Sequence, residues 1–140
     1  MITTRLARTA LVVPLLASGC ASRTDVRHLP AQGALGPYSA SVEAHGLLFV
    51  SGKIGARGGD FAAEAASAID AVEAELARAG LALRDVVSAT VYLTDIGRYA
   101  ELNQAWERRF AEPFPARACI AVAALPGGAL VEVAVVAARR

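Results

Sequence analysis

An amphipathic segment in the middle of the chain constrains the fold more than any other part of the sequence. Residues 60–80 read DFAAEAASAIDAVEAELARAG, and the apolar positions recur at spacings of three and four residues (Ala65, Ile69, Val72, Leu76 and Ala79). Asp60 is a favourable N-cap residue, and Gly80 suits the position that follows the last helical turn. A helix with one apolar stripe must cover another layer of structure. We therefore predict a helix from Asp60 to Ala79 that packs on a sheet.

Segments typical of strands lie on both sides of this helix. Apolar and β-branched residues predict strands over 38–43, 47–51, 86–93, 117–124 and 130–138. A second helix is predicted over 98–110, with a buried stripe of Tyr99, Leu102, Trp106 and Phe110. The order is β-β-α-β-α-β-β, which predicts a mixed α/β domain in which one sheet carries two helices on one face.

The composition excludes several classes of protein. The 140 residues correspond to one domain, and 55% hydrophobic against 19% charged residues excludes an intrinsically disordered chain. The net charge of +1 and the lack of a basic cluster predict no nucleic-acid partner. Two cysteines and two histidines, without ligand spacing, predict no metal site. A cysteine protease and a glycine-rich phosphate loop also lack support.

The first residues have the layout of an export signal. Arg5 and Arg8 precede an apolar run, residues 10–17, that is shorter than the ~20 residues needed to span a bilayer. Ser18-Gly19-Cys20 resembles a bacterial lipobox, although Ala17 stands where leucine is usual. We predict a signal peptide over 1–19, a lipidated Cys20, a flexible tether over 20–32 and a folded domain over 33–140. The protein would then be a membrane-anchored, periplasm-facing lipoprotein of the cell envelope. The alternatives are a soluble periplasmic protein with an ordinary cleaved signal peptide, and an uncleaved anchor.

Two charged residues interrupt apolar strands near the carboxyl terminus. Arg117 lies at the start of ARACIAVAAL, and Glu132 is the sole charge in ALVEVAVVAA. A strand as apolar as the first is expected to be buried on both faces or at an interface. An arginine there needs a carboxylate or phosphate partner, because an unpaired buried charge is costly. Both residues are therefore candidate site residues. The alternatives are an exposed arginine at a strand entrance and a structural ion pair for Glu132, which could include Arg117.

A geometric argument separates these two residues within one subunit. If the last two strands form a hairpin about Gly127-Gly128, Glu132 lies near Ala121 or Val122. Arg117 is then about 13–17 Å away, at ~3.3 Å per residue. If both residues serve one site, we expect them to come from neighbouring subunits of an oligomer.

Three further residues are candidates for the same site. Asn103 follows Tyr99 by four residues, so its amide faces the buried side of the second helix and needs partners. Tyr38 follows the Gly36-Pro37 turn just before the first strand. Cys119 shares a face with Arg117, and we expect it to be a buried small hydrophobe rather than a nucleophile.

Five ordered blocks of the sequence resemble a known family. The blocks GPYSASV, LLFVSGKI, AGLALRDVVSATVYLTD, YAELNQAWERRF and FPARACIAVAALPGGALVEVAVVA are similar to the Rid (YjgF-type) family of reactive-intermediate deaminases. The resemblance covers roughly Gly33 to Arg140. It implies a chorismate-mutase-like α/β fold and a barrel-like homotrimer whose ligand sites lie in clefts between subunits.

The resemblance also implies an activity and roles for the candidate residues. Deaminases of this family hydrolyse enamines and imines such as 2-aminoacrylate to 2-oxo acids and ammonia, without a cofactor. Arg117 would bind the substrate carboxylate with help from the backbone at Cys119, and Glu132 would orient or deprotonate the attacking water. Three further residues, Tyr38, Asn103 and Ser51, match pocket-lining positions of the family. We group Tyr38 with the catalytic residues, and Asn103 and Ser51 with the substrate-binding residues.

Departures from the family pattern leave a second function open. Lys53 stands where the family's SGQ motif has glutamine, and Ala40 replaces the glutamine usual after GPYS. Ala65 and Ala66 replace a polar pair in the first helix. Known sources of 2-aminoacrylate are cytosolic, so an exported deaminase would need an envelope substrate. The alternative is a noncatalytic trimeric envelope protein that binds a small carboxylate, such as an imino or 2-oxo acid, in the same cleft.

Overall fold

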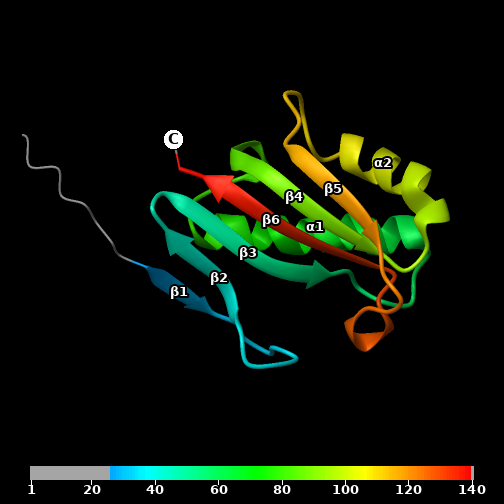
Figure 1. Ribbon diagram of the computed structural model, residues 1–140, viewed down its shortest axis with the longest axis horizontal. Coiled ribbons are helices and arrows are strands. Elements are labelled where there is room, and N and C mark those ends of the chain that lie inside the picture. Colours follow the sequence, from blue (N-terminus) through cyan, green and yellow to red (C-terminus); the bar gives the residue numbers. More distant parts are fainter. Residues whose placement is uncertain (1–25, 140) are drawn as a thin grey trace, which may run out of the picture.

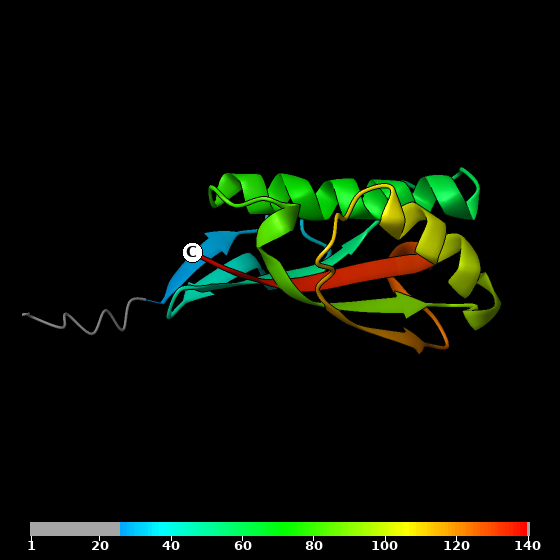
Figure 2. The same cartoon turned by 90° about the horizontal axis from the view of Figure 1, so that it is seen from above.

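The computed structural model describes residues 26–139, which form a six-stranded sheet with two α-helices on one face (Figures 1 and 2). The strands are β1 (Arg27–Pro30), β2 (Ser39–Ala44), β3 (Leu47–Ile54), β4 (Val86–Leu93), β5 (Ala116–Ala121) and β6 (Val131–Ala138). The helices are α1 (Phe61–Arg78) and α2 (Tyr99–Glu107). The sheet order is β1-β2-β3-β6-β4-β5, and the mixed α/β architecture expected from the sequence is confirmed.

The sheet contains one strand that the sequence did not predict. β1 lies within the segment expected to be a tether, and it pairs antiparallel with β2. Pairing uses backbone groups, so a strand can form there without an alternating apolar pattern. Arg27 also donates to the Glu43 carboxylate at 2.8 Å, and Leu29 packs against the core. The sheet therefore begins before residue 33.

The prediction that the last two strands form a hairpin is wrong, because β4 lies between β5 and β6 in the sheet. β5 is an edge strand parallel to β4, and β6 pairs antiparallel with both β4 and β3. Residues 122–130 form a connection long enough to pass the end of β4, a span of about 10 Å. The Thr94 N–H group donates to the Leu130 carbonyl at 3.1 Å and holds this connection against the end of β4.

The predicted ends of α1 are confirmed, and those of α2 need correction. The Asp60 carboxylate accepts the Ala63 N–H at 2.8 Å, and Gly80 adopts a left-handed backbone with φ 72°. α2 ends at Glu107 rather than near residue 110, and Tyr99 is 44% exposed rather than part of the buried stripe. Its position in the first turn of α2 places Tyr99 at the rim of the domain instead of in the core.

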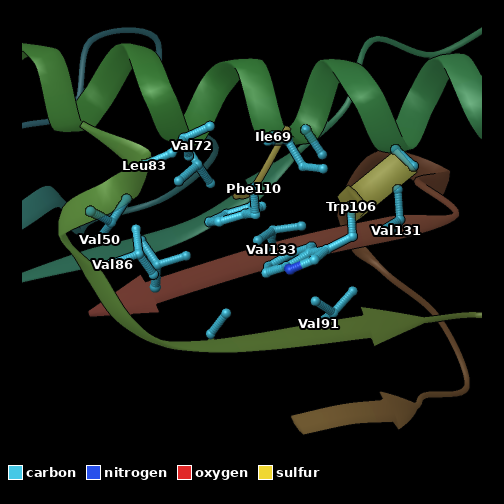
Figure 3. Packing of buried hydrophobic residues seen from close by; sticks show 14 of the residues in the cluster. Val50, Ile69, Val72, Leu83, Val86, Val91, Trp106, Phe110, Val131 and Val133 are labelled. Carbon is cyan, nitrogen blue, oxygen red and sulfur yellow. The ribbon is translucent and has the colours of Figure 1, made fainter. Parts of the chain in front are cut away.

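The core lies between the helices and the covered face of the sheet (Figure 3). Ile69 and Val72 of α1 point toward Val133 and neighbouring side chains of the sheet. The rings of Trp106 and Phe110 stack with centroids 4.0 Å apart. No helix within residues 26–139 is long and apolar enough to cross a membrane.

The opposite face of the sheet has no covering helix (Figure 2). Phe49 and Ile120 are each 45% exposed, and their strand positions alternate with those of core residues, which places both on this open face. A shallow hollow beside Phe49 includes Thr90, Ala134 and Val136. The open face thus combines apolar and small side chains over several strands.

Candidate functional site

Arg117 is held at the edge of the sheet by residues of α2. Its register partner on β4 is Ala89, a core residue, so the Arg117 side chain lies on the helix-covered face. One guanidinium nitrogen, Nη2, donates to Asn103 Oδ1 at 2.5 Å and to the Tyr99 hydroxyl at 3.3 Å. The guanidinium also lies 5.0 Å from the centroid of the Trp106 ring. The predicted inward direction of Asn103 is confirmed.

The partners of Arg117 are all uncharged. Within residues 26–139, no carboxylate forms an ion pair with this guanidinium, so its charge is not neutralised by the subunit. A hollow of about 360 Å³ opens beside it, which we call the arginine hollow; it is lined by Tyr99, Asn103, Trp106, Glu107, Phe114, Pro115 and Arg117. A half-buried guanidinium with two neutral partners retains donors for a carboxylate.

Glu132 belongs to a different hollow on the other side of the sheet. Its neighbours in β6, Val131 and Val133, are core residues, so Glu132 points to the open face. A hollow of about 210 Å³, which we call the glutamate hollow, is lined by Leu35, Tyr38, Ser51, Gly52, Ile54, Pro126 and Glu132. No side chain among the described residues bonds to this carboxylate. The structure thus brings Tyr38, Ser51 and Glu132 together.

A β-bulge shapes the floor of the glutamate hollow. Ser51 and Gly52 of β3 together face Ala134 of β6, because the register shifts by one residue between Val50 and Lys53. A Cβ atom on Gly52 would lie 1.7 Å from Glu132 Oε1, so only glycine leaves room for this carboxylate. The Ser51 hydroxyl donates to the Ser39 carbonyl at 2.7 Å and fixes the neighbouring strand.

The two hollows cannot form one site within a single subunit. Arg117 aligns with Ala89 on β4, whereas Glu132 aligns with Tyr92, three residues or about 10 Å farther along the strand. Their side chains also point to opposite faces of the sheet. The sequence-based inference that the two residues do not pair in one subunit therefore holds, although the hairpin on which it rested does not exist.

Cys119 behaves as the sequence predicts for a structural residue. It is aligned with the core residue Val91, and it packs against the core from the same face of β5 as Arg117. Burial raises the pKa of the Cys119 thiol, and the nearby positive charge of Arg117 offsets only part of that effect. A thiol kept protonated in this way is a poor nucleophile.

Some residues of these hollows were not predicted as site residues. Tyr99 was assigned to the buried stripe but is exposed beside the guanidinium, and Trp106, a core residue as predicted, also contacts it; the spacing of Tyr99 four residues before Asn103 was the available signal. The requirement for glycine at Gly52 depends on contact with a strand distant in sequence. Within the described part of the chain, no group of three or more histidine, cysteine, aspartate or glutamate side chains could hold a metal ion. Cys20 lies outside the described residues.

Comparisons with known proteins match nearly the whole described domain. The family model described as "Endoribonuclease L-PSP" matches residues 29–139. The chain is 43% identical over 112 residues to a RutC family protein of Sinorhizobium fredii, which covers 74% of this chain and 87% of that protein. It is 36% identical over 119 residues to the 2-iminobutanoate/2-iminopropanoate deaminase of Escherichia coli, which covers 79% of this chain and 93% of that protein.

Solved structures agree with this assignment. The crystal structure of yeast YEO7 superimposes with a TM-score of 0.78 at 31% identity, covering 83% of this chain and all of that one. The structure of Escherichia coli TdcF with bound serine gives a TM-score of 0.73 at 31% identity, covering 82% of this chain and 98% of that one. The sequence, the fold and the two hollows lead to the same conclusion: the chain belongs to the YjgF/RidA family, which the Endoribonuclease L-PSP model represents.

Proposed function

We propose that this protein hydrolyses reactive enamine and imine intermediates to 2-oxo acids and ammonia without a cofactor. The observation that carries the proposal is the Arg117 guanidinium, which donates to the uncharged Asn103 and Tyr99 and borders an open hollow. Such a group suits the carboxylate that every 2-imino acid brings with it. The name of the related Escherichia coli protein, a 2-iminobutanoate/2-iminopropanoate deaminase, supports the same substrate class.

The reaction requires the protein mainly to position the substrate and a water molecule and to transfer protons between them. An enamine first takes a proton at C3 and becomes an imine or iminium, whose C2 is electrophilic. Arg117 holds the carboxylate, and Glu132 accepts a proton from water as the oxygen bonds to C2. Glu132 then returns its proton to the amine nitrogen of the resulting carbinolamine, and ammonia leaves as the C–N bond breaks and the hydroxyl group loses its proton, which leaves the 2-oxo acid. Tyr38 and Ser51 line the hollow in which this water would lie.

We propose that the complete cleft forms between neighbouring subunits of a homotrimer. The arginine hollow of one subunit would face the glutamate hollow of the next, because the two lie on opposite faces of the sheet in a single subunit. The exposed apolar side chains of the open face, such as Phe49 and Ile120, supply a surface for such contacts. A trimer is also typical of this family.

A coupled assay with a matched variant tests the activity. An amino-acid oxidase generates the imine in place, and the formation of the 2-oxo acid is followed with and without the protein. We expect Arg117→Ala to lower the rate by at least about 100-fold, because a charge-assisted bidentate contact is lost. Arg108→Gln, which removes an exposed arginine of the same sequence region, should leave the rate unchanged.

Two results would contradict the proposed deaminase. Equal rates for Arg117→Ala and the unmodified protein would remove the role of the guanidinium. No turnover of several imino acids, together with saturable binding of a 2-oxo acid that depends on Arg117, would favour the noncatalytic binding protein instead. Cleavage of RNA is not favoured by a sequence with a net charge of +1 and no basic cluster.

We also propose that the protein is exported and anchored through a lipidated Cys20. The support is the sequence of residues 1–20 alone, namely the basic start, the short apolar run and the small residues before the cysteine. Two or three acyl chains would suffice for stable anchoring. Cys20→Ser should move the protein from the membrane to the soluble fraction, and unchanged fractionation would contradict the lipid anchor.

A further inference from the structure

Lys53 is the only lysine in the sequence, and it is not among the residues that line either hollow of the proposed cleft. Its register partner on β6 is Val133, a core residue, so its side chain extends over the helix-covered face of the sheet. The side chain is 18% exposed, and among the described residues it forms one polar contact, with Glu75 Oε2 at 3.4 Å. An ammonium group has three N–H donors, so this long contact leaves it incompletely paired.

Glu75 is already well paired without Lys53. Its carboxylate accepts the Ser41 hydroxyl at 2.6 Å and an Arg78 guanidinium N–H at 2.8 Å, and its side chain is only 5% exposed. Burial raises the pKa of Glu75, but the bond from Ser41 and the charges of Lys53 and Arg78 outweigh it and hold the pKa below its usual value. The carboxylate is therefore ionised near neutral pH, and one negative charge is shared by two cations.

A cavity of about 240 Å³ lies beside these charges. We call it the lysine cavity; it is lined by Ala31, Gln32, Gly33, Ala34, Tyr38, Ala40, Lys53, Glu75 and Arg78. The ionisable side chains that face it are Lys53, Arg78, Glu75 and the Tyr38 phenol, so its net charge near neutral pH is positive. Arg78 also donates to the Pro30 carbonyl at 3.3 Å, which fixes the loop that closes the cavity.

We propose that the lysine cavity is a second binding site, for a small oxyanion carrying a phosphate or carboxylate group. Lys53 and Arg78, which both line the cavity, would each donate to the anion. The anion would neutralise the surplus positive charge that Glu75 leaves uncompensated. Ala40 contributes only a methyl group to the wall, which leaves the space open. This proposal does not rest on the deaminase activity.

The lone lysine allows a direct test on the full chain. Lysine labelled with ¹³C at Cε gives one side-chain resonance from Lys53, and this resonance is followed during titration with sodium phosphate, sodium acetate or sodium chloride at matched ionic strength. We expect a saturable shift with phosphate, with acetate or with both, and the salt that saturates identifies the anion group. Equal, non-saturating shifts with all three salts would overturn the proposal.

Variants separate this site from the proposed cleft. Calorimetry of the saturating anion is carried out in an Arg117→Ala background, so that the arginine hollow does not contribute. Lys53→Gln should weaken binding at least about tenfold, whereas Lys53→Arg and the control Arg108→Gln should retain it. Binding by Lys53→Gln at the affinity of its parent would overturn the proposal. If Lys53→Gln fails to fold, Arg78→Gln replaces it, with the Lys53 resonance as the readout.

Discussion

Glu132 illustrates, at the scale of the residue, how an apolar strand accommodates a charged side chain. The strand alternates core valines with residues of the open face, and Glu132 occupies one of the latter positions. It therefore avoids burial in the core, and it lies in a hollow with Tyr38 and Ser51. The sequence pattern identified Glu132 as an anomaly, but its neighbours come from strands that are distant in sequence.

Glu132→Gln tests the proton-transfer role directly. An amide keeps the size of the side chain but cannot accept a proton from water, so we expect kcat to fall by about 10²–10⁴ while KM changes little. The control is Glu101→Gln, which removes an exposed carboxylate of α2 that is paired with Arg98. Steady-state kinetics of both variants provide the measurement. A rise in KM with kcat unchanged would show instead that Glu132 binds substrate without taking part in the proton transfer.

Glu75→Gln tests the buried ion-pair cluster through its dependence on pH. The pKa of Glu75 in the folded protein is below the ordinary value of 4.5, so its ionised form stabilises the fold above that pH. As the pH falls below 4.5, the unfolded chain takes up the proton first and this stabilisation is lost. We expect Glu75→Gln to lower the free energy of unfolding by about 1–3 kcal/mol at pH 7, with a smaller difference near pH 4. Urea denaturation at both pH values measures this difference in the free energy of unfolding. A difference that does not depend on pH would contradict the stabilising role of the ionised Glu75 carboxylate.

At the scale of the element, local sequence signals predicted most of the helices and strands, but they did not predict which strands pair in the sheet. Asp60 and Gly80 set the ends of α1 through contacts within a few residues, so the sequence contains the information. β1 and the order of β5 and β6 depend on backbone pairing with distant strands, which leaves no local pattern. The same limit applies to the candidate site: the sequence singled out Arg117 and Asn103, which the structure brings into contact, but it did not predict the close approach of Gly52 to Glu132.

The bulge of β3 gives a prediction at this scale. In Gly52→Ala the new methyl group would collide with the Glu132 carboxylate, whose flexible end can rotate away. We therefore expect at least about a tenfold loss of kcat/KM with a change of about 1 kcal/mol or less in the free energy of unfolding. Gly55→Ala is the contrasting variant, because its Cβ would lie 2.0 Å from the backbone oxygen of Glu64 and should destabilise the fold. Kinetics and denaturation of both variants distinguish the two effects, and a Gly52→Ala protein with full activity would contradict this reading of the bulge.

At the scale of the whole molecule, the proposed cleft combines the arginine hollow of one subunit with the glutamate hollow of another. Arg117→Ala and Glu132→Gln proteins should each be inactive alone. Mixed after unfolding and refolding together in equal amounts, they should recover about a quarter of the unmodified activity, because one cleft in four combines an intact Arg117 with an intact Glu132. Sedimentation of the mixture checks that trimers form. Absence of any recovery in a mixture that sediments as trimers would contradict a shared cleft.

The bulge in β3 also determines on which face of the sheet the later side chains of that strand lie. Val50 and Lys53 are three positions apart, yet both align with valines of β6 that point into the core. Regular pairing of the same residues without the bulge would align Gly52 with Val133 and Lys53 with Glu132, which would place the chain's only ammonium group on the face that carries this carboxylate. The bulge thus keeps the two opposite charges on opposite faces of one sheet and prevents a direct cation–carboxylate pair.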